Sequence, residues 1–399
     1  MQPITTEKKK IFLCSGEVSG DMHGANLVRR IRTLAPEFEF AAVGGERMRA
    51  AGVRLLADST TWGSVGAFES AAKAPWVYPA MRRMPALLRA EQPDVFVPID
   101  YRYFNMRAAR AAHEQNIKTI YFFAPVSWFG SGPGRFAPIA QTVDLALLTL
   151  PFSHDDYRAA GANFEFIGHP IMDTARPDLD AAGAHEFFGT DPQRPVIGLM
   201  PGSRFQEVKR LLPVFRNAAA MILKQIPDAQ FLLFAATGPL EQYIRRLTAQ
   251  TPITIINEHV YDFMSISNLL IMCSGTAAHE ATVLGRPMIV AYKISAPTAW
   301  LARRMVDIKF IAMPNIVADS FVVPELVQEA CTPQAVADLA CALLSDPARR
   351  DTMERGLGDV RRKLGGAGAL DRAAHRVVDA ALGRIPEFRE SKPGAEHSG

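Results

Sequence analysis

Short apolar runs alternate with longer amphipathic stretches along the chain, and this alternation predicts strands that are each followed by a helix. The runs are continuous rather than alternating, which is typical of strands buried on both faces of a parallel sheet. Between them, stripes such as Leu27, Ile31 and Leu34 predict helices with one apolar face. The predicted strands form two series, at 10–15, 93–100, 119–125, 143–150 and 164–170, and at 195–202, 229–236, 253–258, 268–275 and 287–292.

Because the strand and helix alternation occurs in both halves, we predict an α/β protein with two doubly wound, Rossmann-like domains. A stretch rich in Pro, Gly and Asp at 174–195 separates the two series and is the expected boundary. We therefore expect an N-terminal domain over 1–175 and a C-terminal domain over 190–365. A helix at about 366–385 is expected to pack back on the first domain, and the polar tail 386–399 is expected to be disordered.

Composition narrows the class of protein. The 399 residues are 48% hydrophobic and 21% charged, which is ordinary for a soluble protein of two domains. A net charge of +3 is too small to imply nucleic-acid binding. The four cysteines lack CxxC or zinc-site spacing, so we expect reduced thiols, a cytoplasmic protein and no metal. No apolar run reaches the ~18 residues that span a bilayer, so any membrane contact is expected at the surface.

Glycines and polar residues follow the first predicted strand. Gly16, Gly20 and Gly24 recur every fourth residue and clear one face for the close approach of a ligand or of the facing domain. The carboxyl ends of parallel strands are where open α/β sheets bind ligands. A tightly packed turn between strand and helix is the alternative. The candidate binding residues here are Gly16, Glu17, Ser19 and Asp21.

Asp100 comes directly after the predicted strand that ends in Val97-Pro98-Ile99. A carboxylate at this edge of a parallel sheet is well placed to act as a general base. An aspartate at the same place also serves commonly as the N-cap of the next helix. Both interpretations remain open from the sequence.

Aromatic and Met residues mix with basic residues between positions 62 and 84. This mixture suits a surface that contacts a membrane, since aromatic groups favour the interface and arginines favour anionic lipids. An ordinary helix with an apolar core side and a basic solvent side is the alternative. The candidate membrane-facing residues are Trp62, Phe68, Trp76, Met81, Arg82 and Arg83.

Two strand-to-helix turns in the second half carry the strongest signals. Arg204 ends the turn Pro-Gly-Ser-Arg, where helix N–H groups and a guanidinium favour a diphosphate. The strand 268–273 ends at Ser274, Gly275 and Thr276, and Glu280 follows in the first turns of the next helix. Backbone N–H groups there suit phosphate, and the carboxylate suits the hydroxyls of a ribose. His279 is expected to pack rather than to catalyse, and Asn315 either caps a turn or meets the ligand.

These motifs, taken in order, resemble the lipid-A-disaccharide synthase family, whose members have the GT-B fold with two domains facing a central cleft. The resemblance runs from Ser15 to about Glu329. The matching blocks are Gly16–Ala25, Gly44–Met48, Pro93–Asp100, Phe166–Pro170, Pro201–Val208, Ser274–Glu280, Thr298–Arg304, Met313–Asn315 and Val323–Glu329.

The resemblance implies an inverting transfer of diacylglucosamine from UDP-2,3-diacylglucosamine to 2,3-diacylglucosamine-1-phosphate, which gives the β-1,6 disaccharide 1-phosphate and UDP. It implies no cofactor and no metal, a peripheral enzyme on the cytoplasmic face of the inner membrane, and a homodimer. Asp100 matches the family's candidate base, and Asn105 lies on the acceptor side. The positions that match the UDP side are Arg204, Ser274, Gly275, Thr276, Glu280, Asn315 and Gln328.

The sequence departs from the family pattern at 101–103 and at 124–131, both on the acceptor side. The donor-side motifs are intact, so the donor is better defined than the acceptor. Three alternatives therefore stay open: a UDP-sugar epimerase of the same fold, a related transferase with another acceptor, and a UDP-sugar-binding protein without catalysis.

Overall fold

The computed structural model describes residues 7–59, 67–127, 133–235, 238–296, 298–300 and 309–385, with the backbone alone for 67–77 and for 133. Its contacts divide the chain into two compact units, one of residues 1–170 with 366–399 and one of residues 171–365. The division falls ahead of the 174–195 stretch. That stretch instead contributes helix α8 (Ala181–Phe188) to the second unit, where it contacts α11 (Val260–Ile266).

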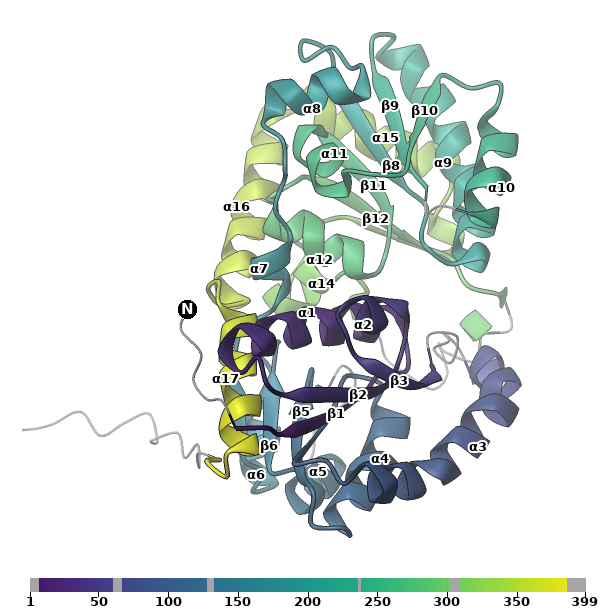
Figure 1. The fold of residues 1–399 in the computed structure, drawn as a ribbon. Coiled ribbons are helices and arrows are strands. Elements are labelled where there is room, and N and C mark those ends of the chain that lie inside the picture. Colours follow the sequence, from purple (N-terminus) through teal and green to yellow (C-terminus); the bar gives the residue numbers. More distant parts are fainter. Residues whose placement is uncertain are drawn as a thin grey trace, which may run out of the picture. The chain divides into compact units, whose positions relative to one another are not determined.

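The first unit is built on a seven-stranded parallel sheet in the order β3-β2-β1-β4-β5-β6-β7. Its inner strands are buried along nearly their whole length, which explains their continuous apolar sequences. The strands, grouped in the lower half of Figure 1, are β1 (Lys10–Cys14), β2 (Glu39–Gly44), β3 (Arg54–Asp58), β4 (Val95–Pro98), β5 (Lys118–Phe122), β6 (Leu145–Leu148) and β7 (Phe164–Phe166).

Helices cover both faces of this sheet. On one face, α1 (Val18–Leu34) packs beside α17 (Ala369–Ala381), which brings Ala373 and Val377 into the same core as Leu27 and Ile31. The other face carries α3 (Ala67–Glu91) and α4 (Arg102–His113), around Met84. The remaining helices are α2 (Glu46–Ala50), α5 (Ala137–Thr142), α6 (His154–Ala159) and the short 3₁₀ turn η1 (Pro133–Arg135).

The second unit repeats the plan with a six-stranded parallel sheet in the order β10-β9-β8-β11-β12-β13. The strands are β8 (Val196–Met200), β9 (Gln230–Phe234), β10 (Ile253–Ile256), β11 (Leu269–Cys273), β12 (Met288–Tyr292) and β13 (Glu325–Val327). The further helices are α7 (Ile171–Thr174), α9 (Phe205–Gln225), α10 (Pro239–Thr248), α12 (Thr276–Val283), α14 (Met313–Ala318), η2 (Gln328–Ala330), α15 (Pro333–Ser345) and α16 (Pro347–Lys363). The predicted class of two doubly wound α/β units is confirmed.

The C-terminal tail and the absence of a membrane span were both expected from the sequence. The tail 386–399, predicted to be disordered, lies outside the described residues. In the part of the chain that is described, no helix combines the length and the apolar character needed to cross a membrane.

Candidate functional site

Asp100 lies just past the carboxyl end of β4, at the centre of the first sheet. Asp100 and Tyr101 both adopt left-handed backbone conformations, with φ of 49° and 44°. Helix α4 starts after them with Tyr101 as its N-cap, and no side chain caps it. The alternative in which Asp100 serves as the helix cap is therefore wrong.

The environment of Asp100 favours a base that works near neutral pH. Desolvation comes first, followed by repulsion from the Glu17 carboxylate, and together they raise the pKa of Asp100 to about 6. The backbone N–H of Tyr101 opposes the shift. An ordinary aspartate has a pKa of about 3.9, so this carboxylate holds a proton more strongly than most. Glu17 itself remains partly exposed, as does Ser19 on the first turn of α1.

The structure gives the spaced glycines a role other than ligand approach. A Cβ atom at Gly16 would lie 2.1 Å from the ring of Tyr101, and one at Gly20 would lie 2.9 Å from Cβ of Ser15. At Gly24 the obstacle is Met48, at 2.1 Å. The face that the glycines clear is thus filled by side chains of the same unit, as the tight-turn alternative expects, and ligand binding at this turn stays a prediction.

Asp21 and Asn105, both predicted to be ligand-binding residues, are buried and engaged with the backbone. The Asp21 carboxylate accepts hydrogen bonds from the N–H groups of Gly45, Arg47 and Met48, so it caps α2. Asn105 donates through Nδ2 to the carbonyl oxygens of Cys14, Ile99 and Asp100, at 3.3, 3.0 and 2.8 Å. Both residues thus organise the sheet edge, and their role toward an acceptor stays a prediction.

In the second unit, the N-terminus of α9 is already occupied by a carboxylate. Glu207 accepts hydrogen bonds from the N–H groups of Ser203 and Arg204, and its other oxygen accepts from Nη1 of Arg204 at 2.9 Å. Gly202 has φ of 119°, and a Cβ there would lie 2.6 Å from the Glu207 carboxylate. An anion at this turn therefore meets the half-exposed Arg204 side chain and a carboxylate already bound to the N–H groups of Ser203 and Arg204.

The N-terminus of α12 differs, because no side chain within the described ranges caps it. Gly275 and Thr276 are exposed there, at the carboxyl end of the central strand β11. Uncapped N–H groups at a helix start, together with the positive end of the helix dipole, favour a phosphate. Four residues on, Glu280 accepts a hydrogen bond from the Tyr261 hydroxyl at 3.2 Å. The predicted phosphate-binding residues and the predicted ribose-binding carboxylate of Glu280 thus lie on one short helix, α12.

Asn315 is fully buried, and both ends of its amide are satisfied internally. Its Oδ1 accepts from the N–H groups of Val322 and Val323, and its Nδ2 donates to the Val323 carbonyl and to the Glu325 carboxylate. Glu325 also accepts from the N–H of Ile311, and the Ile311 carbonyl accepts from the Ser274 hydroxyl at 2.8 Å. The turn-capping alternative for Asn315 is correct.

Two further predicted positions flank this network. Gln328 follows β13 with a left-handed φ of 53° and is partly exposed. His279 lies beside Glu280, and burial lowers its pKa to about 4, so the ring is neutral at pH 7. A neutral, desolvated imidazole agrees with the expectation that His279 packs.

The candidate membrane-facing residues lie on or just before α3. Of these, Trp62 and the side chains of Phe68 and Trp76 lie outside the described residues. Arg82 and Arg83 are exposed and Met81 is partly buried. Arg82 lies over the ring of Tyr78, whose side chain is 54% exposed. Aromatic and basic groups are therefore both accessible on this helix.

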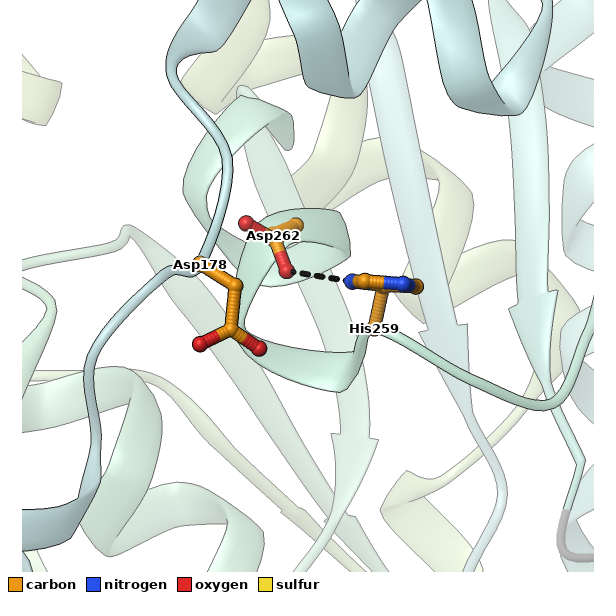
Figure 2. Close-up of side chains that lie close together, drawn as sticks. All are labelled: Asp178, His259 and Asp262. Atoms are coloured by element: carbon orange, nitrogen blue, oxygen red, sulfur yellow. Dashed lines mark hydrogen bonds and ion pairs between the residues drawn. The ribbon is translucent and has the colours of Figure 1, made fainter.

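One group in the described part of the chain has the ligand atoms of a metal site close together: Asp178, His259 and Asp262, within 4.8 Å of one another. Figure 2 shows the three side chains, with the bond between His259 and Asp262 dashed. Asp262 is buried and already accepts from His259 Nδ1 at 3.1 Å and from the Leu179 N–H at 2.6 Å. These bonds attach the segment before α8 to α11, so we interpret the group as a structural latch.

Several residues that shape these sites were missed by sequence reasoning: Tyr121, Glu207, Tyr261 and Glu325. Each acts on a predicted residue through a hydrogen bond. Only Glu207 had a local signal, since it lies three residues after Arg204 at the spacing of a capping box. The other contacts depend on the tertiary fold.

The two Rossmann-like units, together with the solved structures that share this architecture, place the chain in the GT-B fold class. A UDP-GlcNAc 2-epimerase from Neisseria meningitidis bound to UDP-GlcNAc aligns with a TM-score of 0.64 at 12% identity, over 94% of this chain and all of that one. A kitacinnamycin glycotransferase aligns equally well, at 16% identity over 94% and 100%. At such identities the likeness concerns the fold alone.

Sequence comparison is more specific. The lipid-A-disaccharide synthetase family model matches residues 11–368. A lipid-A-disaccharide synthase from Geobacter metallireducens is 35% identical over 94% of this chain and 98% of its own length. One from Nitrosococcus oceani is 36% identical over 92% and 95%. The chain belongs to the lipid-A-disaccharide synthetase family and is a glycosyltransferase.

Proposed function

We propose that this enzyme transfers diacylglucosamine from UDP-2,3-diacylglucosamine to 2,3-diacylglucosamine-1-phosphate with inversion. Asp100 takes the proton of the acceptor's 6-hydroxyl, and that oxygen attacks the anomeric carbon. The bond from the anomeric carbon to UDP breaks, and UDP leaves with its electron pair. The products are the β-1,6 disaccharide 1-phosphate and UDP. The observation that carries the proposal is the family match over residues 11–368, together with Asp100 at the carboxyl end of the central strand β4, where desolvation and Glu17 raise its pKa.

On the donor side, we propose that the uncapped start of α12 receives the diphosphate and that Glu280 receives the ribose hydroxyls. Arg204 turns from Glu207 to the departing diphosphate, which stabilises the charge that develops as UDP leaves. Ser274 and Asn315 act indirectly, since they fix the strand-to-helix turn. Gln328 is the last residue that we propose on the UDP-binding side.

On the acceptor side, we propose that Glu17 and Ser19 border the acceptor and that α3 lies against the cytoplasmic face of a membrane. A cavity of about 560 Å³ between α3 and α4 is lined by the exposed aromatic residues Tyr78 and Tyr103 and by Arg82 and Arg107. Such a surface suits anionic headgroups. The expected homodimer stays a prediction.

The proposal is tested by measuring UDP release from UDP-2,3-diacylglucosamine with and without 2,3-diacylglucosamine-1-phosphate. We expect release only when the acceptor is present, and a disaccharide product by mass spectrometry. Turnover of the UDP-sugar without acceptor would identify an epimerase or a hydrolase instead. UDP binding by calorimetry with no release would identify a binding protein or a transferase with another acceptor.

The pH profile should follow the ionisation of Asp100. A base must be deprotonated to act, so kcat/KM is expected to fall as the pH drops through about 6. Replacing Glu17 by Gln removes the like charge, lowers the pKa of Asp100 and moves this acid limb to lower pH. The exposed Glu37→Gln variant is the matched control and should leave the limb in place. An unchanged limb in Glu17→Gln would show that the Glu17 carboxylate does not act on the titrating group.

A further inference from the structure

A fully buried tyrosine lies directly behind Asp100. Tyr121 belongs to β5, the strand next to β4, and its hydroxyl donates to the carbonyl oxygen of Asp100 at 2.7 Å. The N–H of Asp100 donates in turn to the carbonyl of Phe122 at 3.1 Å. The end of β5 therefore holds the backbone of Asp100 on both sides.

This hold matters because the backbone there is strained. Left-handed conformations are uncommon outside glycine, and a tyrosine in one is a stronger outlier than an aspartate. Asp100 and Tyr101 adopt them in succession, with φ of 49° and 44°. Such a turn persists only where the surrounding structure fixes it. Strain of this kind concentrates at functional sites, where it preorganises a reacting group.

The Asp100 carbonyl accepts two hydrogen bonds, from Tyr121 and from Nδ2 of Asn105 at 2.8 Å. Two donors match the two lone pairs of a carbonyl oxygen and fix the plane of the peptide between residues 100 and 101. That plane adjoins Cα of Asp100, so holding it helps to hold the left-handed turn from which the Asp100 side chain leaves the backbone. Burial raises the pKa of Tyr121 well above its usual value, so its hydroxyl remains a donor across the physiological range.

We propose that the Tyr121 hydroxyl is a positioning group for catalysis, which keeps the strained Asp100 turn in the conformation that directs the carboxylate to the acceptor hydroxyl. The inference rests on the proposed function in which Asp100 is the base. Tyr121 touches no substrate and acts through Asp100 alone. Small displacements of a base can cost up to about 10²-fold in rate, which is why such a buried hydroxyl affects turnover.

The test is Tyr121→Phe, which removes only the hydroxyl, beside Tyr157→Phe as the matched control. Tyr157 is also fully buried in the first unit, and its hydroxyl also donates to a backbone carbonyl at 2.7 Å, that of Pro125. Each loss leaves one carbonyl with one donor fewer, so similar decreases in thermal midpoint are expected. Rates are measured at a temperature at which circular dichroism shows all variants folded.

We expect Tyr121→Phe to lower kcat about tenfold, with the KM for the UDP-sugar unchanged within twofold, and Tyr157→Phe to leave both near wild type. In the Asp100→Asn background, the same substitution should have no further effect on the residual rate. A wild-type kcat for Tyr121→Phe, or an equal effect in both backgrounds, would overturn the positioning role while leaving the base in place. Full turnover by Asp100→Asn itself would exclude Asp100 as the general base, and it would exclude the positioning role of Tyr121 as well.

Discussion

Asp100→Asn is expected to lower kcat by about 10³-fold, because the amide cannot accept the proton of the acceptor hydroxyl. The substitution is isosteric, so the fold and the affinity for UDP should change little. Acceptor-dependent UDP release gives kcat, and calorimetry with UDP alone gives the affinity.

An exposed aspartate of the same unit supplies the control. Asp155 lies on the first turn of α6 and pairs with Arg158 at the surface, so Asp155→Asn should retain full turnover. Loss of UDP binding in Asp100→Asn would mean that the residue supports the fold rather than the reaction. A kcat within tenfold of wild type would exclude Asp100 as the general base.

Most strands that are buried on both faces could be predicted from their continuous apolar runs. The ten predicted runs all contain strands of the two sheets, and the centre of each sheet is completely buried. Three strands lie outside these runs, β2, β3 and β13. β2 lies inside its sheet, whereas β3 and β13 each lie at an edge. β3 exposes part of every residue, and β13 has three residues, so neither shows a continuous apolar run. Edge strands are paired on one side only, and their sequences reflect it.

Asp100 could be placed from sequence because its position follows from the strand before it. The roles of Asp21 and Asn315 were harder to predict, since a sequence motif gives the residue types and their spacing but not the atoms that they contact. Their partners are backbone groups brought close by folding, at Gly45 and Met48 for Asp21 and at Val322 and Val323 for Asn315. A polar residue in a family motif therefore supports the backbone of a site as readily as it touches a ligand.

The N-termini of α9 and α12 also show that similar sequence motifs can have different contacts in the fold. Both follow a strand at the centre of the sheet and both have a turn with glycine, so the sequence predicted an anion at each. Glu207 fills the start of α9, whereas α12 has no described side chain at its start. The two starts therefore differ in whether a carboxylate at the third helical residue binds the backbone just before the helix, as in a capping box.

Asn315→Ala is expected to reduce the free energy of unfolding by about 3–5 kcal/mol, since it leaves several buried polar groups without partners. The N–H groups of Val322 and Val323 lose their shared acceptor, and the Glu325 carboxylate loses a donor at 2.7 Å. Urea denaturation, followed by circular dichroism, measures the change. The turn at Ser274 depends on the same network, so UDP affinity should fall together with stability.

The Asn315→Asp variant isolates the contact with Glu325. It keeps the acceptor for the two N–H groups but sets a second carboxylate against that of Glu325, and two such groups cannot both ionise at contact distance. The pair is expected to hold a proton when folded, which raises its pKa above the unfolded value. The destabilisation of Asn315→Asp should therefore be small below the unfolded pKa near 4 and grow as the pH rises toward 7. Equal destabilisation at pH 4.5 and pH 7.5 would show that the Asn315 amide does not act through Glu325.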